Sequence, residues 1–338
     1  MLVVMNANAT PAQIEAVSAR IRELKYTPHV IPGPTRTAIG ITGNKGAEGR
    51  DSLRLMPGVE DVIRVTSPYK LVSRETHTEL TEFPIAQTRI GPGGCTLMAG
   101  PCSVENEEMI LRCAELFMSR GVKLLRGGAF KPRTSPYAFQ GLGDEGLRLL
   151  EKTRQKTGIG IVTEVLDVLD VERIEAVADV LQVGTRNMQN YALLRRLSQT
   201  RKPVLLKRGM AATLEEWLMA AEYIAAGGNR RIILCERGVR TFSDHTRNTL
   251  DLSIIPVAKH YTHLPVIADP SHGTGKAQFV PSMARAALAA GADGLLIEVH
   301  PEPARAISDG AQSLDFAAFE KMLAELRPIA DAMHVELR

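Results

Sequence analysis

Three cationic side chains follow one another within eight positions of the chain, directly after a short apolar run. The run covers residues 122–125, and Arg126, Lys131 and Arg133 come after it, separated by two glycines and Pro132. Arginine can hold a phosphate or a carboxylate through two parallel hydrogen bonds. Glycine permits a sharp turn or a close approach to a ligand. The stretch therefore fits either an anion pocket for a small phosphorylated substrate or a solvated basic loop, and does not by itself choose between them.

A second group of residues has the chemistry of metal ligands. Cys102, His272, Glu298 and Asp309 together offer one thiolate, one imidazole and two carboxylates. This mixture suits a borderline divalent ion such as Mn, Fe, Co or Zn better than Mg or Ca, which prefer oxygen ligands. With four protein ligands, a fifth position could accept water or a carbonyl oxygen. The structural alternative is that Cys102 is a small buried apolar residue and His272 a turn residue bonded to the backbone.

Charged residues also follow the other short apolar runs of the chain. Glu164, Lys207 and Arg237 each come at or just after such a run, and Arg186 follows a further one. The cations at these positions could neutralise a substrate with a phosphate and a carboxylate, or two phosphorylated substrates. The cationic set is Arg126, Lys131, Arg133, Arg186, Lys207 and Arg237. We expect one polar active site to which all these side chains contribute.

The elements that would position these residues alternate between strands and helices from residue 95 onward. Strand-like runs recur at residues 97–99, 122–125, 160–163, 180–183, 204–206, 231–235, 266–268 and 294–297. Helical patterns lie between or after them, for example at residues 105–119, 171–178, 213–225, 281–290 and 316–333. Eight such repeats predict an α/β fold of the (β/α)8 TIM-barrel type, in which the C-terminal strand ends carry the chemistry. A doubly wound sheet is less suitable, because no GxGxxG follows a first strand.

The segment before the barrel has a different order of elements. Residues 1–67 show the pattern βαββαβ, which is typical of a small ferredoxin-like domain. Its first helix begins with Thr10, Pro11 and Gln13, the signature of a capping box with proline at the first helical position. Residues 68–83 are polar and are taken as a linker, and residues 84–338 as the catalytic barrel, with a hairpin or strand near 83–94 closing its bottom.

Composition limits the partners of the protein. The chain has 338 residues, 44% hydrophobic and 23% charged, with a net charge of +3, which is too small to indicate nucleic acid or a membrane surface. No apolar stretch reaches the length of a membrane span, and no signal peptide is apparent. The four cysteines form no CxxC pair. We therefore expect reduced thiols in a cytoplasmic protein.

Several of these motifs together closely resemble 3-deoxy-D-arabino-heptulosonate-7-phosphate (DAHP) synthases of the short form that carries an N-terminal ferredoxin-like domain. The motifs are GPCSVE at residues 100–105, Arg126 with KPRT at 131–134, KRG at 207–209, DPSH at 269–272 and SDGAQ at 308–312. The resemblance extends over almost the whole chain. It shows no departure at the metal or substrate positions.

The resemblance implies the first committed step of the shikimate pathway, in which phosphoenolpyruvate, erythrose 4-phosphate and water give DAHP and phosphate. It implies that Cys102, His272, Glu298 and Asp309 are the ligands of a divalent metal ion. It also implies a phosphoenolpyruvate site made by Arg126, Lys131, Arg186, Lys207 and Arg237. Arg133 and Thr134 would hold the erythrose phosphate. We expect Lys131 to donate a proton toward the former aldehyde oxygen, and Glu164 with Lys207 to hold the attacking water.

Three alternatives stay open at this point. The sister octulosonate-8-phosphate synthase uses arabinose 5-phosphate, but typically has Ala-Asn-Arg after its loop lysine, where this chain has Pro132 directly after Lys131. A Schiff-base aldolase would use Lys207 or Lys123 as nucleophile and need no metal. A non-catalytic sensor of phosphorylated metabolites would keep the pocket without the reaction.

The resemblance further implies that the N-terminal domain is regulatory and binds an aromatic amino acid, Phe or Tyr, as a feedback inhibitor. His29 is a candidate contact for such an effector, although an ordinary surface histidine is the interpretation we favour. The apolar face of a four-stranded sheet suggests pairing between subunits, so we expect a homo-oligomer, in particular a tetramer.

Overall fold

The computed structural model describes residues 1–33, 36–44, 49–63, 67–133 and 135–338, in two compact units. The first unit comprises Met1–Glu79 with Tyr261–His263, and the second comprises Leu80–His260 with Leu264–Arg338. Within the first unit, Leu71 and Val72 are buried and Ser73 forms an isolated β-bridge with Thr262. The boundaries expected from the sequence, 1–67, 68–83 and 84–338, stay a prediction.

The N-terminal part of the first unit is a four-stranded antiparallel sheet with two helices. Its elements are β1 (Leu2–Met5), α1 (Pro11–Glu23), β2 (Thr27–Pro32), β3 (Thr37–Thr42), α2 (Arg50–Arg54) and β4 (Val59–Ile63). The strand order β2-β3-β1-β4 is that of the ferredoxin-like fold, which confirms the prediction. The capping box predicted for α1 is formed by Thr10 and Gln13. The predicted second helix covers residues 46–55 and the predicted last strand residues 59–65; of these, residues 46–48 and 64–65 lie outside the described residues.

The second unit is a closed barrel of eight parallel strands. They are β7 (Gly94–Gly100), β8 (Leu124–Arg126), β9 (Gly160–Val165), β10 (Val180–Val183), β11 (Val204–Lys207), β12 (Ile232–Glu236), β13 (Val266–Ala268) and β14 (Gly294–Glu298). Each strand pairs with the next in sequence, and β14 pairs with β7 to close the ring. Every residue of these strands is buried, as expected where helices cover a parallel barrel. The predicted TIM barrel is confirmed.

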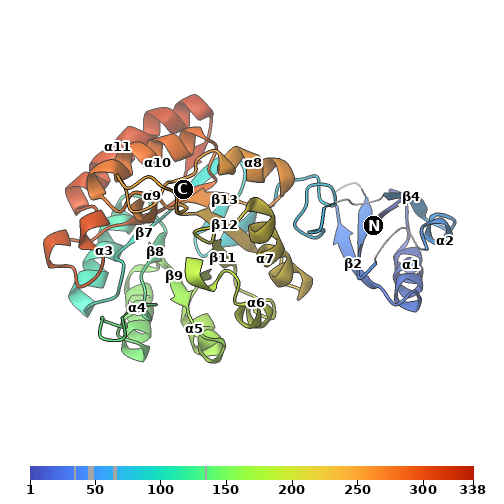
Figure 1. Ribbon diagram of the computed structural model, residues 1–338, viewed down its shortest axis with the longest axis horizontal. Helices are drawn as coiled ribbons and strands as arrows, with labels where there is room; N and C mark the ends of the chain where they lie inside the picture. Colours follow the sequence, from blue (N-terminus) through green and yellow to red (C-terminus); the bar gives the residue numbers. More distant parts are fainter. Residues whose placement is uncertain (34–35, 45–48, 64–66, 134) are drawn as a thin grey trace. The chain divides into compact units, whose positions relative to one another are not determined.

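Helices surround the strands on the outside (Figure 1). They are α3 (Glu107–Ser119), α4 (Asp144–Thr157), α5 (Val171–Val177), α6 (Tyr191–Leu197), α7 (Leu214–Ala226), α8 (Ile254–Tyr261), α9 (Pro270–Thr274), α10 (Val280–Ala289) and α11 (Phe316–Met333). Local sequence sets their starts: Thr213 and Glu216 form a capping box at α7, and Asn106 caps α3. Among the described residues, no helix is both long and apolar enough to cross a membrane.

A short hairpin closes the N-terminal end of the barrel. Its strands are β5 (Phe83–Ile85) and β6 (Thr88–Ile90), and a final strand, β15 (Glu336–Leu337), pairs with the start of β7. Phe83, Ile85 and Ile90 form one buried cluster with barrel residues such as Met98 and Leu296. The hairpin expected from the sequence is therefore present. It fills this end with apolar side chains and leaves the C-terminal end for polar ones.

Candidate active site

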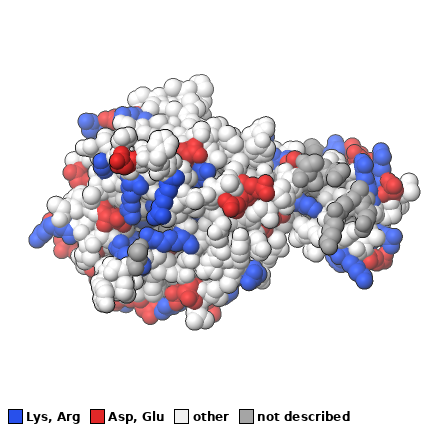
Figure 2. All heavy atoms as spheres, in the orientation of Figure 1, with Lys and Arg blue, Asp and Glu red and all other residues white. Residues whose placement is uncertain are grey.

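A polar cavity of about 350 Å3 lies at the C-terminal ends of the barrel strands. Its lining contains eight Lys or Arg residues and only two acidic ones, and Figure 2 shows Lys and Arg gathered over the strands of the barrel. The lining residues are Arg126, Lys131, Pro132, Arg133, Glu164, Gln182, Gly184, Thr185, Arg186, Lys207, Met210, Arg237, Arg240, Arg247, Asn248, His272 and Asp309. Such a surplus of positive charge in a concave site favours a multiply anionic ligand.

The structure brings together all the described residues that the sequence indicated for substrates. The lining includes the whole cationic set (Arg126, Lys131, Arg133, Arg186, Lys207 and Arg237) and Glu164. Thr134 lies outside the described residues. The basic stretch from the last residue of β8, Arg126, to Arg133 is thus part of a pocket. The alternative of a solvated basic loop does not apply to its buried members Arg126 and Lys131.

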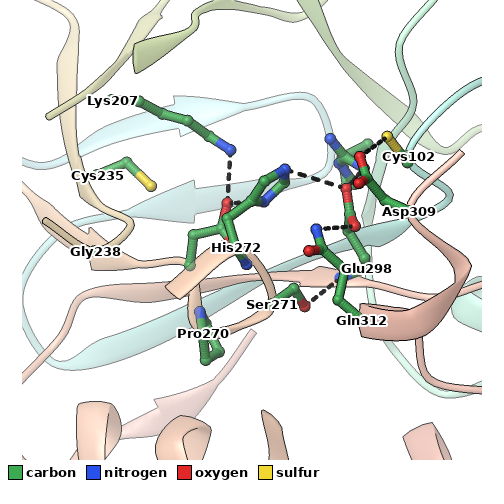
Figure 3. A network of polar contacts seen from close by, with 12 residues as sticks. Cys102, Lys207, Cys235, Gly238, Pro270, Ser271, His272, Glu298, Asp309 and Gln312 are labelled. Carbon is green, nitrogen blue, oxygen red and sulfur yellow. Dashed lines mark hydrogen bonds and ion pairs between the residues drawn. The ribbon is translucent and has the colours of Figure 1, made fainter. Parts of the chain in front are cut away.

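Three of the four residues predicted as metal ligands form a compact cluster. Ligand atoms of Cys102, Glu298 and Asp309 all lie within 4.8 Å of one another. The Cys102 thiol donates to Oδ2 of Asp309 at 3.0 Å. His272 is the fourth member, with its Nε2 3.4 Å from Oε1 of Glu298 (Figure 3). Segments as far apart as residues 102 and 309 therefore meet at one point of the barrel mouth.

Neighbouring groups orient this cluster. Arg126, at the end of β8, donates to Oε1 of Glu298 at 2.8 Å and to the carbonyl oxygen of Pro101 at the same distance. Asp269 is fully buried, and its Oδ2 lies 2.7 Å from Nδ1 of His272 and 2.6 Å from Nζ of Lys207. Nδ1 of the imidazole therefore faces Asp269, without a hydrogen bond of its own among the described residues, and Nε2 faces Glu298.

The ionisation of the cluster reflects its burial and its mixed charges. Burial and, to a smaller extent, the carboxylate of Glu298 raise the pKa of the Cys102 thiol to about 11. Burial alone would raise the pKa of the Glu298 carboxyl, but His272 and Arg126 outweigh it and lower that pKa. The pKa of Asp309 is likewise low because the Cys102 hydrogen bond and Arg247 outweigh burial. A buried thiol, two carboxylates held in the charged form and an imidazole suit a borderline divalent cation.

Arg237 is the clearest sign of an anionic ligand. The residue is 6% exposed, and its Nε and Nη1 are buried without a hydrogen-bond partner among the described residues. An unpaired buried donor is costly, and a guanidinium more so than a neutral group. A phosphate or carboxylate in the cavity would supply the missing acceptors.

Lys131 and Glu164 both line the cavity, and each is held by a hydrogen bond to a neighbouring residue. Nζ of Lys131 donates to the carbonyl oxygen of Cys102 at 2.9 Å, which places the amine beside the metal-ligand cluster. Gly128 makes room for this: a Cβ there would lie 2.7 Å from Cδ of Lys131. Oε2 of Glu164 accepts from Nε2 of Gln182 at 3.3 Å.

Arg133 and Arg186 are tied to the loop after β8. Arg186 donates to the carbonyl oxygen of Pro132 at 3.1 Å. Arg133 donates to the carbonyl oxygen of Phe139 at 3.0 Å and contacts the hydroxyl of Ser308. The two guanidinium groups therefore bond the carbonyl oxygens of residues 132 and 139 in this loop.

Several residues that contact the cluster have no individual role predicted from the sequence, among them Asp269, Gln312 and Arg247. The first two belong to motifs already noted at residues 269–272 and 308–312. Arg247 lies in the long segment between β12 and α8, which has no regular periodicity. Long loops without secondary structure in a compact domain are commonly functional, and this was the available signal.

Comparison with known proteins agrees with the geometry of the site. The family model described as DAHP synthetase I matches residues 73–333. The chain belongs to the DAHP synthetase I family. A second model, the DAHP synthase ferredoxin-like domain, matches residues 1–67, so this member of the family carries that domain before its barrel. The chain is accordingly an enzyme of the DAHP synthase type.

Relatives of this DAHP synthetase family member extend over its full length. A Thermotoga maritima protein named phospho-2-dehydro-3-deoxyheptonate aldolase is 47% identical, with 100% of both chains covered. Proteins named 2-dehydro-3-deoxyphosphooctonate aldolase are more distant: that of Syntrophotalea carbinolica is 37% identical over 69% of this chain and 90% of its own. The crystal structure of the Thermotoga maritima DAHP synthase superimposes with a TM-score of 0.79 over 100% of this chain and 99% of that one. A truncated form of the Thermotoga maritima enzyme gives 0.75 over 80% of this chain and 99% of that one.

Proposed function

We propose that the chain condenses phosphoenolpyruvate with erythrose 4-phosphate and water to give DAHP and phosphate, the first step of the shikimate pathway. The observation that carries the proposal is the cationic cavity next to the cluster of Cys102, Glu298 and Asp309. In this cavity, Nε and Nη1 of the buried Arg237 have no acceptor within the described part of the chain. Both substrates bear phosphate, and phosphoenolpyruvate adds a carboxylate. The positive charge of the cavity lining complements the negative charges of these two substrates.

The proposed phosphoenolpyruvate site consists of Arg126, Lys131, Arg186, Lys207 and Arg237. Arginine suits the planar carboxylate and the phosphate because it can donate two parallel bonds. Arg126 and Lys207 are buried and already paired with Glu298 and Asp269, so their positions are fixed before a substrate enters. Preorganised charges of this kind cost no rearrangement when charge develops in the reaction.

Cys102, His272, Glu298 and Asp309 would hold a divalent ion such as Mn, Fe, Co or Zn. When bound, the ion would supply Lewis-acid polarisation of the aldehyde carbonyl, which the weakly nucleophilic phosphoenolpyruvate needs. The donor set supports this proposal because its thiol and two carboxylates lie within 4.8 Å of one another, and Nε2 of the imidazole is 3.4 Å from Oε1 of Glu298. Asp269 then acts on the site by turning Nε2 of His272 toward Glu298.

The remaining steps are proton transfers and water addition. C3 of phosphoenolpyruvate forms the new carbon–carbon bond with the aldehyde carbon, and Lys131 would donate a proton to the former aldehyde oxygen. Water then adds at C2, held by Glu164 and Lys207, and phosphate leaves by cleavage of the C2–O bond. Glu164 can receive a proton from this water, since its carboxylate lines the cavity and keeps Oε1 free of the Gln182 bond.

The aldehyde is proposed to be erythrose 4-phosphate, held through Arg133 and Thr134. The support is the sequence after the loop lysine, where Pro132 follows Lys131 directly. More distant relatives named as phosphooctonate aldolases match 69% of this chain, and arabinose 5-phosphate is therefore the competing aldehyde.

The decisive assay measures phosphate release from phosphoenolpyruvate with each aldehyde, with and without a strong chelator. We expect release with erythrose 4-phosphate, little with arabinose 5-phosphate, and loss after chelation that divalent metal restores. Preference for the five-carbon aldehyde would indicate an octulosonate synthase. Chelator-resistant turnover with borohydride trapping would indicate a Schiff-base lysine. If no phosphate is released with either aldehyde, the protein would be a non-catalytic sensor of phosphorylated metabolites.

We further propose that the ferredoxin-like domain is regulatory and responds to Phe or Tyr, and that the enzyme is a cytoplasmic homotetramer. His29 lies on β2, and its Nε2 is 2.8 Å from Oγ1 of Thr42 on the neighbouring strand. An effector contact through His29 would have to share the ring with this interaction.

A further inference from the structure

Gln312 connects two charged groups of the site. It belongs to the turn η5 (Gly310–Gln312) and is 2% exposed. Its Nε2 donates to Oε2 of Glu298 at 2.6 Å, and its Oε1 accepts from Nη1 of Arg247 at 2.9 Å. The two contacts fix which end of the amide faces Glu298, because a flipped amide would place its oxygen against the carboxylate and its NH2 against the guanidinium.

Both oxygens of the Glu298 carboxylate are thus restrained by donors. Oε1 accepts from Arg126 at 2.8 Å and Oε2 from Gln312. The backbone NH of Glu298 also donates to Oγ of Ser271 at 2.9 Å (Figure 3). The carboxylate cannot rotate without losing at least one of these contacts.

Arg247 is itself anchored to the segment that bears His272. Its backbone NH donates to the carbonyl oxygen of Thr274 at 2.9 Å, and the neighbouring Asn248 donates through Nδ2 to the carbonyl oxygen of His272 at 2.9 Å. The Arg247 guanidinium also contacts Oδ1 of Asp309 at 3.1 Å. One side chain therefore touches Gln312 and Asp309 from a backbone attached to α9.

We propose that Gln312 is a positioning residue of the metal site, which holds the Glu298 carboxylate for a borderline divalent cation through an amide whose orientation Arg247 fixes. The inference rests on the proposed function, since it takes Glu298 as a ligand. Loss of a hydrogen-bond partner of a metal ligand typically lowers metal affinity by about 10- to 100-fold, and we expect an effect of this size for Gln312. Gln312 is uncharged, so its removal changes orientation without changing the charge felt by the cation.

The test is a titration of the full-length, chelator-treated protein with Co2+ alone, followed by the d–d and thiolate-to-cobalt bands. The variant Gln312→Met keeps the size of the side chain and removes both hydrogen bonds. We expect about 10- to 100-fold weaker Co2+ binding and altered d–d bands. The matched control is Gln199→Met, which removes an amide that lies outside the cavity lining, and its Co2+ affinity should equal that of the wild type.

A double-mutant cycle separates two effects of Arg247: its hydrogen bond to the Gln312 amide and its positive charge. Loss of that cation would by itself favour Co2+, and this contribution is the same in both backgrounds. Arg247→Met should therefore weaken binding more in the wild type than in Gln312→Met. The Arg247 side chain is 43% exposed, so we expect the Arg247→Met protein to fold even if the Gln312→Met protein does not. In that case the inference predicts altered Co2+ d–d bands for Arg247→Met alone.

The outcomes distinguish this inference from the proposed function. The metal site is supported if the wild-type protein binds Co2+ with a thiolate-to-cobalt band and the Cys102→Ala variant lacks this band. If Gln312→Met then keeps wild-type affinity and bands, or if the cycle is additive, the positioning role is wrong and the metal site stands. If Gln312→Met does not fold and Arg247→Met shows the same Co2+ d–d bands as the wild type, the positioning role of Gln312 is also wrong. A wild type that binds no Co2+ through Cys102 overturns both.

Discussion

The carboxylate of Asp269 lies 2.7 Å from Nδ1 of His272, in a position from which solvent is excluded. The same oxygen is 2.6 Å from Nζ of Lys207. Burial alone would raise the pKa of Asp269, but His272 and Lys207 outweigh it and hold the pKa well below the ordinary range. One charged oxygen therefore fixes both the imidazole of the metal-ligand cluster and a cation of the substrate cavity.

Asp269→Asn should lower kcat/KM by about 10- to 100-fold and weaken divalent-metal binding, because the amide cannot pair with both partners as a charge. Steady-state phosphate release and a metal titration on the same preparation would measure the two effects. If the variant keeps both kcat/KM and metal affinity within about twofold of the wild type, Asp269 does not have the role given to it here. Far-ultraviolet circular dichroism would verify that the variant is folded.

Metal binding should release a proton from Cys102. In the metal-free protein the pKa of this thiol is raised to about 11, so at pH 7 to 8 the thiol is protonated. A cation that takes the thiolate must displace this proton, so apparent affinity should rise about tenfold per pH unit in this range if no other ligand titrates. Calorimetry in two buffers of different ionisation enthalpy would count the protons. Cys102→Ser is the control, and pH-independent binding would contradict the thiolate ligand.

Gly184→Ala should displace Glu164. A Cβ on Gly184 would lie 2.0 Å from Oε1 of Glu164, so the carboxylate would have to move. We expect kcat to fall by up to about 100-fold while KM for phosphoenolpyruvate changes little, since the water and not the substrate loses its partner. Gly40→Ala, where the added Cβ meets atoms only at 3.5 Å or beyond, is the matched control. A normal kcat would exclude Glu164 from water positioning.

Lys131→Met should reduce kcat by about 100- to 10,000-fold, the usual range for a general acid. The lost amine lies 2.9 Å from the Cys102 carbonyl oxygen, beside the cluster where the aldehyde would bind. Lys123→Met serves as control and also tests the alternative Schiff-base nucleophile. Near-normal turnover by Lys131→Met, with both substrates bound, would remove Lys131 from the mechanism.

Removal of residues 1–67 should leave phosphate release intact and abolish inhibition by Phe or Tyr. The truncated protein should keep residues 68–79, because Ser73 forms a β-bridge with Thr262 and Arg74 bonds the carbonyl oxygen of Tyr261. A truncated form of the Thermotoga maritima enzyme has a determined structure, which supports the design. Inhibition curves for full-length and truncated enzyme would be compared, and full inhibition of the truncated form would refute the regulatory assignment.

The sequence alone was sufficient for the barrel and for most of its strand ends. Buried parallel strands are short apolar runs, and the residue after each run, such as Glu164 or Arg237, must lie at the C-terminal face once the barrel is known. The capping box of Thr10 and Gln13 was equally local, because its two hydrogen bonds span three residues. Residue type and spacing along the chain contain this information.

The tertiary structure decided which of these residues touch. Asp269 could have been an ordinary helix cap, and it does accept from the backbone NH of His272 at 2.9 Å. Only the closed barrel brings Lys207, from another strand, to its second oxygen. The contact of Arg247 with Gln312 joins residues 65 positions apart through a loop that has no periodic signal. Distances between segments depend on closure and packing of the whole ring, and no local pattern encodes them.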